Sequence, residues 1–170
     1  MEGELLALRL IHVLGGIFWV GSALFNALFL FPAFAQAGPA AGQVMAELAR
    51  RRAFIFMPVI ALLTILSGIR LMGITSGFSS DYLSTPSGRT FAIAALAAIL
   101  AFVFGILVNR PVGVRVAQIS ASLANAAPDE RQRLSAELDK FRGRLSMATT
   151  VVVILLLVAA TGMAIGRYVS

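Results

Sequence analysis

The chain has 170 residues, of which 59% are hydrophobic, and its mean hydropathy is +0.90. These values exclude an ordinary soluble domain of this length. The mass of 18.0 kDa leaves room for about four membrane-spanning helices of roughly 20 apolar residues each. The formal charge of +6 is typical of an oriented membrane protein, so nucleic acid is excluded as a partner. The absence of cysteine excludes disulfides, iron–sulfur clusters and thiolate metal sites.

Four apolar segments predict an all-α fold, a polytopic membrane four-helix bundle, in one domain covering residues 1–170. The spans cover about 4–34, 53–75, 90–109 and 145–166, and each is long enough to cross a bilayer. Gly38, Pro39 and Gly42 predict a loop after the first span, and Arg110-Pro111 predict the end of the third. The lipid bilayer is therefore the main partner that the composition predicts.

Residues 110–144 differ from the spans, because their apolar side chains recur only at helical spacing. These are Val112, Val116, Ile119, Leu123, Leu134, Leu138, Phe141 and Leu145. Pro128-Asp129-Glu130 predicts a helix start, with proline first and acids in the first turn. We expect an amphipathic cytoplasmic helical hairpin between helices three and four. A helix lying flat on the membrane is an equally good interpretation.

The distribution of Lys and Arg predicts the orientation. Ten of the 14 lie in the first and third loops, on one side: Arg50, Arg51, Arg52, Arg110, Arg115, Arg131, Arg133, Lys140, Arg142 and Arg144. Only Arg9, Arg70, Arg89 and Arg167 lie on the other. Because basic loops stay in the cytoplasm, we expect a multi-pass protein with both termini outside.

The only histidine, His12, lies inside the first span. An ionisable side chain at membrane depth is costly and marks a functional site by default. One face of this helix is small or polar and is expected to turn inward; it carries His12, Gly15, Gly16, Trp19, Ser22, Ala23 and Asn26. The glycines leave space for a neighbouring helix or a flat ligand.

One interpretation is that His12 is an axial ligand of a b-type heme, since imidazole nitrogen binds iron. Gly15, Gly16 and Trp19 would lie beside the ring. Arginines near the outer face would pair with the propionates through charge-assisted hydrogen bonds; these are Arg9, Arg70 and Arg167. A second axial ligand would be a methionine or His12 of another protomer, unless the iron is five-coordinate.

Three alternatives stay open at this point. His12 with Met72 and Met163 offers an imidazole and two thioethers, a set that suits Cu(I). His12 could instead hydrogen-bond to a backbone carbonyl, to Ser67 or to Thr161 in a purely structural assembly subunit. No residue pattern identifies a catalytic group, and an enzymatic activity, if present, would be that of an oxidoreductase.

Several short motifs resemble those of a known group of membrane proteins. They are Ile-His-Val-Leu-Gly-Gly-Ile-Phe-Trp-Val-Gly at 11–21, Arg-Arg-Arg-Ala-Phe-Ile-Phe-Met-Pro at 50–58, Ser-Gly-Ile-Arg-Leu-Met at 67–72 and Gly-Arg-Thr at 88–90. The group comprises the four-helix bacterial protoporphyrinogen oxidases and the copper-resistance D-like integral membrane proteins. The resemblance implies a four-helix bundle of the bacterial inner (plasma) membrane, with His12 at the position associated with heme.

The chain departs from the oxidase branch in its third span. That branch has a lysine there, often followed by a histidine, and residues 91–109 contain neither. The resemblance therefore implies a divergent member that transfers electrons or serves as a respiratory accessory subunit. Its expected partners are further copies of itself or subunits of a respiratory complex.

Overall fold

The computed structural model describes residues 2–37, 39–123 and 126–169, which form helices joined by turns. The elements in chain order are α1 (Glu2–Phe25), η1 (Asn26–Leu30), α2 (Phe31–Ala37), α3 (Pro39–Arg50), α4 (Ala53–Ser76), α5 (Ser80–Ser84), α6 (Pro86–Phe104), η2 (Gly105–Asn109), α7 (Arg110–Leu123), α8 (Pro128–Ile165) and η3 (Gly166–Tyr168). Four continuous helical stretches are long and apolar enough to cross a membrane: Glu2–Ala37, Ala53–Ser76, Pro86–Leu123 and Pro128–Tyr168. The all-α fold and its four potential spans are thus as predicted.

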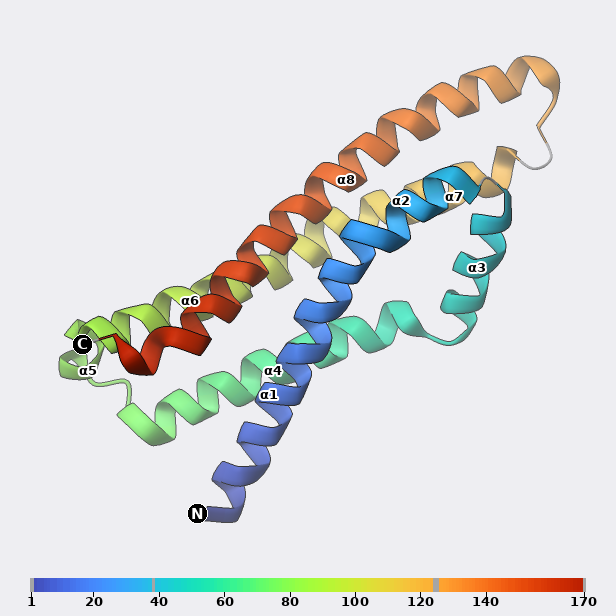
Figure 1. Cartoon of the computed structure of the whole chain (residues 1–170). Coiled ribbons are helices and arrows are strands. Elements are labelled where there is room, and N and C mark those ends of the chain that lie inside the picture. The colour runs from blue at the N-terminus through green and yellow to red at the C-terminus, as the bar shows by residue number, and fades with distance from the viewer. Residues whose placement is uncertain (1, 38, 124–125, 170) are drawn as a thin grey trace.

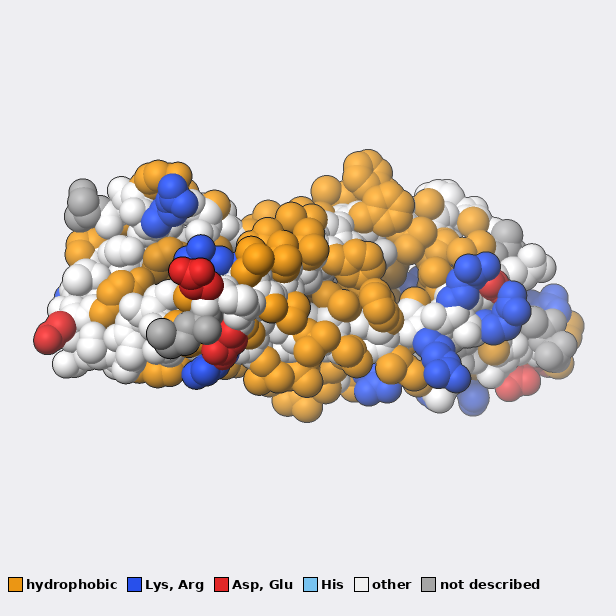
Figure 2. Space-filling model, turned by 90° about the horizontal axis from the view of Figure 1, so that it is seen from below, with side chains coloured by type: hydrophobic (Ala, Val, Ile, Leu, Met, Phe, Trp, Pro, Cys, Tyr) orange, Lys and Arg blue, Asp and Glu red, His pale blue; other side chains and the backbone are white. Residues whose placement is uncertain are grey.

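The molecule is elongated and has two different ends (Figure 1). Both chain termini, α5 and the last turns of α4 lie at one end, the terminal end. The helix α3, the last turn of α7 and the start of α8 lie at the other, the basic end. Figure 2 shows a broad band of apolar side chains between two charged regions. Such a band is suited to hydrocarbon, and it indicates a lipid bilayer environment.

The core lies in the middle of the molecule. It comprises Trp19, Ala61, Ala101, Val152 and Leu156, contributed by α1, α4, α6 and α8. Alanines at these contacts let the helix backbones approach closely, which is how helices associate in lipid. The indole of Trp19 fills the remaining space and meets the Phe102 ring edge-on, with centroids 6.4 Å apart.

The third long helix does not end at Arg110-Pro111, as the sequence analysis predicted, but continues to Leu123. Proline lacks the N–H that the preceding turn needs, and the π-helical segment η2 lies directly before it. The same arrangement occurs in the first long helix, where η1 precedes Pro32. A wider π-turn accommodates each proline without ending the helix.

Two predicted loops are partly helical. Residues 39–50 form α3, although Pro39 and Gly42 had indicated a loop, because proline is well tolerated at the first helical position. Gly38 lies outside the described residues. The third long helix begins at Pro86, earlier than residue 90, because the Thr85 hydroxyl accepts a hydrogen bond from the Gly88 N–H and caps it.

The basic end has an apolar cluster of its own. It comprises Ile119 of α7, Ala126, and Leu134 and Leu138 of α8, with Val116, Leu123 and Phe141 packed around it. The helix start predicted at Pro128 is confirmed. Arg115 donates a 2.7 Å hydrogen bond to Glu137 and, like Arg144, lies over the Phe141 ring. Ion pairs and cation–π contacts therefore surround this cluster.

Candidate functional site

The His12 ring is held by the backbone of α4. Its Nδ1 lies 2.7 Å from the carbonyl oxygen of Thr64. A carbonyl only accepts hydrogen bonds, so Nδ1 donates and the neutral ring carries its proton there. The lone pair is then on Nε2. Of the alternatives left open by the sequence, the structure has the bond to a backbone carbonyl, and not one to Ser67 or Thr161.

Among the residues that the structure describes, the second ring nitrogen is neither hydrogen-bonded nor fully buried. Nε2 has no hydrogen-bond partner among the described residues. Every buried side-chain nitrogen or oxygen in the described part of the chain does have a partner, so Nε2 is not sealed inside the protein. A ring fixed through Nδ1 with Nε2 free is the arrangement that metal-binding histidines commonly adopt.

Glycines let α1 and α4 approach closely around this ring. A Cβ at Gly68 would lie 2.6 Å from Cε1 and 2.9 Å from Nδ1 of His12, so only glycine leaves room for the imidazole. A Cβ at Gly15 would clash with the Thr64 hydroxyl, whereas one at Gly16 would make ordinary contact. The space beside Gly15 is therefore filled by a neighbouring helix.

The inward face predicted for α1 is the packed face. Along it Trp19 is buried, with 8% of its surface exposed, and His12, Gly15, Gly16 and Asn26 are half-buried. Trp19 lies about two turns, or about 10 Å, from His12 along the helix. The indole therefore packs in the central core and not beside the imidazole.

Met163 lies at about the depth of His12. It follows Leu156, a member of the central core, by about two turns or about 10 Å. It shares a helix face with the buried Ala159 and is itself half-buried. In Figure 1, α1 diverges from α8 toward the terminal end. The thioether of Met163 and the imidazole of His12 thus lie on the core-facing sides of α8 and α1, and these two helices separate toward the terminal end.

Met72 lies one turn beyond Gly68 on the same face of α4, and it is half-buried. It is therefore nearer the terminal end than His12. Within residues 2–37, 39–123 and 126–169, no group of three His, Cys, Asp or Glu residues is close enough to hold a metal ion. Any metal site here would depend on one imidazole and thioethers.

The three arginines expected near the cofactor have different surroundings. Arg70 donates to Glu4 through Nε at 3.0 Å and through a terminal nitrogen at 2.7 Å, which ties α4 to the start of α1. The guanidinium of Arg167 lies 4.7 Å from the centroid of the Tyr168 ring. Arg9 is exposed, about one turn from His12. Only Arg9 and Arg70 belong to the two helices that hold the imidazole.

Sequence reasoning missed two parts of this arrangement. The partners of His12 on α4, Thr64 and Gly68, appear only when the two helices are docked. A second polar contact lies toward the basic end, where the Thr149 hydroxyl donates to Oδ1 of Asn109 at 3.2 Å. The only sequence signal for it was an Asn directly before Arg110-Pro111.

No family model, curated protein or solved structure matches this chain.

Proposed function

We propose that this chain is an integral membrane protein that binds a b-type heme through His12 and serves electron transfer, as a redox carrier or as an accessory subunit of a respiratory complex. One observation carries the proposal: Nδ1 is bonded to the Thr64 carbonyl while Nε2 stays accessible and without a partner among the described residues. At membrane depth such a nitrogen has no water to pair with, and a ligand would satisfy it.

The residues present fit this group in their donor chemistry. His12 would supply the first axial ligand, and Gly68 leaves the room that its ring needs. Met163 could supply the second only if α8 moved toward α1, because the two helices separate at this level; His12 of another protomer is the alternative. Arg9 would face one propionate. Arg70 would face the other if it gave up its ion pair with Glu4 and paired with the propionate instead. A heme held there would supply one-electron redox chemistry.

The hydrogen bond of His12 and the helices around it would both tune the heme in this proposal. The Nδ1–H bond of the imidazole to Thr64 keeps the ring in one orientation and one tautomer, and this raises the basicity of Nε2 as a ligand. The surrounding apolar helices exclude water, which raises the cost of charge at the site and tunes its potential. The resemblance of residues 11–21 to the first helix of the protoporphyrinogen oxidase and copper-resistance D-like group is a second line of support.

The test is a reduced-minus-oxidised visible spectrum with iron and copper analysis on the same detergent-purified sample. We expect a b-type band with nearly one iron per chain, and its loss in His12→Ala with membrane insertion unchanged. Gly21→Ala, in the same helix, is the matched control, because a Cβ there meets nothing within 4 Å. Full heme on the His12→Ala variant would disprove the ligand assignment.

Copper handling is the second candidate, and the half-buried thioethers favour it. Met72, one turn beyond the level of His12, and Met163 are both half-buried, and thioethers suit Cu(I). A colourless protein with stoichiometric copper that is lost in His12→Ala would support this function. A colourless, metal-free protein, after purification in the presence of heme and copper, would leave a structural subunit.

We also propose that the basic end is cytoplasmic and that α7 and the first half of α8 form a hairpin there, outside the bilayer. The excess of Lys and Arg at this end supports the orientation. Because the chain has no cysteine, single substitutions provide clean probes. A membrane-impermeant maleimide should label Ser80→Cys in intact cells and Ser135→Cys only after permeabilisation. The reverse pattern would invert the topology.

A further inference from the structure

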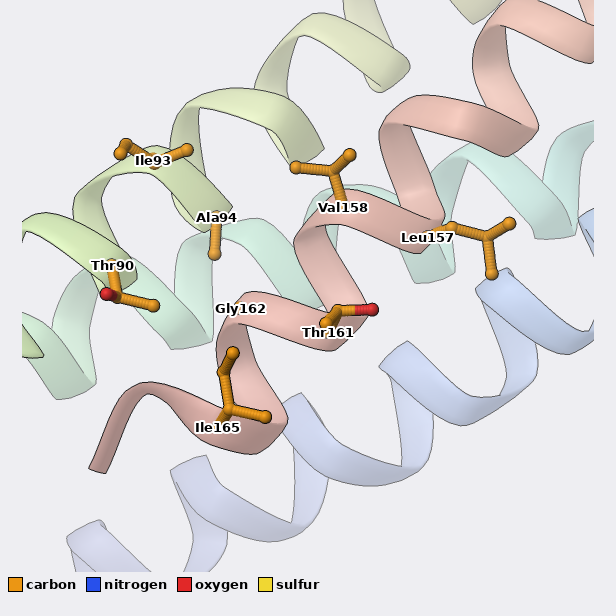
Figure 3. Close-up of a pocket in the computed structure, with 8 residues that line it drawn as sticks. All are labelled: Thr90, Ile93, Ala94, Leu157, Val158, Thr161, Gly162 and Ile165. Atoms are coloured by element: carbon orange, nitrogen blue, oxygen red, sulfur yellow. The ribbon is translucent and has the colours of Figure 1, made fainter. Parts of the chain in front are cut away.

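A groove separate from the His12 site runs between α6 and α8 at the terminal end (Figure 3). It is an open groove with a volume of about 410 Å³, lined mostly by apolar groups together with Thr90 and Thr161. Thr90 and Ile165 line it near the terminal end, and Leu157 and Val158 line it nearer the middle of the molecule.

The floor of this groove is formed by close helix packing. A Cβ at Gly162 would lie only 2.8 Å from the Cβ of Ala94, and Figure 3 shows the Ala94 side chain pointing toward Gly162. Larger neighbours such as Ile93 and Val158 are exposed on either side of this contact. Two small residues between larger ones create a channel along the surface that faces lipid.

Two arginines are close in the chain to residues that line the groove: Arg89 directly precedes Thr90, and Arg167 follows Ile165 by two residues. The ends of the two helices meet at this level, since a Cβ at Gly166 would lie 2.9 Å from the Phe91 ring. Arg89 shortly precedes Phe91 in the chain, and Arg167 directly follows Gly166. Both are exposed, and neither belongs to the ion pairs found among the described residues. Arg167 lies over the Tyr168 ring, but neither arginine has a carboxylate partner in the described part of the chain, so both can still donate to an anion.

We propose that this groove is a binding site for one phospholipid with an anionic headgroup. One acyl chain occupies the channel between α6 and α8, and the phosphate pairs with Arg89 and Arg167. Arginine binds phosphate through charge-assisted hydrogen bonds, and basic residues near the membrane surface attract anionic lipids. This charge complementarity favours a lipid over an uncharged apolar ligand or a second copy of the chain.

Native mass spectrometry of the detergent-solubilised protein tests the site with two lipids of identical acyl chains, phosphatidylglycerol and phosphatidylcholine. We expect one tightly retained phosphatidylglycerol, preferred roughly thirtyfold over phosphatidylcholine for two arginine contacts. The Arg89→Gln/Arg167→Gln double variant should lose the preference, and Val158→Phe, which fills the channel, should weaken retention of both lipids.

Matched controls separate the site from general effects. Arg133→Gln removes an exposed arginine at the basic end, and Leu14→Phe adds an aromatic ring at the separate apolar groove between α1 and α4. Neither should change lipid retention. An undiminished anionic preference in the double variant, or unchanged retention in Val158→Phe, would overturn the proposal. A homodimer abolished by Val158→Phe would do so too, because a second copy would then be the occupant.

Discussion

Arginines pair with a carboxylate or an aromatic ring at both ends of the molecule, and the two ends differ in their remaining polar and apolar groups. At the basic end, several arginines pair with nearby carboxylates or aromatic rings, and the apolar side chains pack into a local cluster. Toward the terminal end, Nε2 of His12 has no partner among the described residues although it lies within a predicted span. Polar groups that are complete within one chain indicate a structural role, and an accessible, incomplete one at membrane depth indicates a ligand site.

The largest effect on stability is expected from Leu138→Ala at the basic end. Leu138 is buried in the cluster with Ile119 and Leu134, and removing a buried leucine side chain costs about 2–5 kcal/mol. Thermal unfolding in detergent, followed by circular dichroism, should show a lower midpoint. Trypsin should also cleave faster at Arg131 and Arg133, which lie in the same helix.

The Leu138→Ala variant also tests whether destabilising the basic end changes the site at the terminal end. Its cofactor content, measured per folded chain, should equal that of the wild type, because Leu138 lies in the cluster at the basic end and His12 lies outside that cluster. A parallel loss of cofactor would show that the two ends are coupled. The exposed Ala136 provides a control, since Ala136→Ser in the same helix should change neither stability nor proteolysis.

Gly68→Ala should have the next largest effect, and at the opposite end. The new methyl would lie 2.6 Å from Cε1 of His12, so the ring must move and its bond to the Thr64 carbonyl weakens. Overpacking of this kind costs about 1–3 kcal/mol. We expect a lower unfolding midpoint together with loss or perturbation of the heme spectrum. Gly21→Ala is the control, because a Cβ there meets nothing within 4 Å.

Thr149→Val probes the boundary between the two ends. It removes the donor to Oδ1 of Asn109, a contact between α8 and the π-helical segment η2. Interhelical hydrogen bonds of this type contribute about 0.6 kcal/mol on average in a membrane protein. The unfolding midpoint should fall slightly. A larger fall would mean that the π-helical turn depends on this bond for its geometry.

Arg70→Gln should affect the cofactor more than the fold. Its ion pair with Glu4 is exposed, and such pairs contribute about 0–1 kcal/mol. If Arg70 faces a propionate, the variant should release heme to apomyoglobin faster than the wild type while keeping His12 ligation. Glu4→Gln is the informative partner variant, because it removes the ion pair but leaves Arg70 able to face a propionate. Identical release rates for all three proteins would exclude Arg70 from the site.

The sequence predicted the parts of this fold that follow from hydropathy and helical period. The four spans, the inward face of α1 and the helix start at Pro128 needed no knowledge of neighbouring helices. The apolar period of residues 112–123 indicated a helical extension of the third span, but local rules place a break at Arg110-Pro111. The π-turn that carries the helix through this proline packs against α8 and leaves no mark in the sequence.

The candidate site was predictable only in its central residue. His12 stands out by its isolation in an apolar segment, but the Thr64 carbonyl is a backbone group and leaves no mark in the sequence. Gly68 is one of 15 glycines, and its role depends on the register between α1 and α4. Chemistry that one side chain carries can be read from sequence, whereas geometry shared by two docked helices cannot.

The smallest expected effect is a pH dependence confined to α3. Hydrogen bonds from Arg50 and Arg51 lower the pKa of Glu47 from its ordinary value of 4.5. A carboxyl whose pKa is lower in the folded than in the unfolded state stabilises the fold above the unfolded value, and that contribution disappears as the pH falls through the folded value. The protection factors of the α3 amides, which correct for the intrinsic exchange rate at each pH, should therefore fall below pH 4.5.

Salt should weaken the effect, since the carboxylate is solvent-exposed and its interactions are screened. Glu47→Gln should remove the pH dependence in α3 and leave the spectrum of the His12 site untouched at every pH. Glu130→Gln, a change of the same charge in α8, should leave the α3 exchange unaltered. If the protection factors of the α3 amides still fell with acid in the Glu47→Gln variant, a group other than this carboxylate would hold α3 at the basic end.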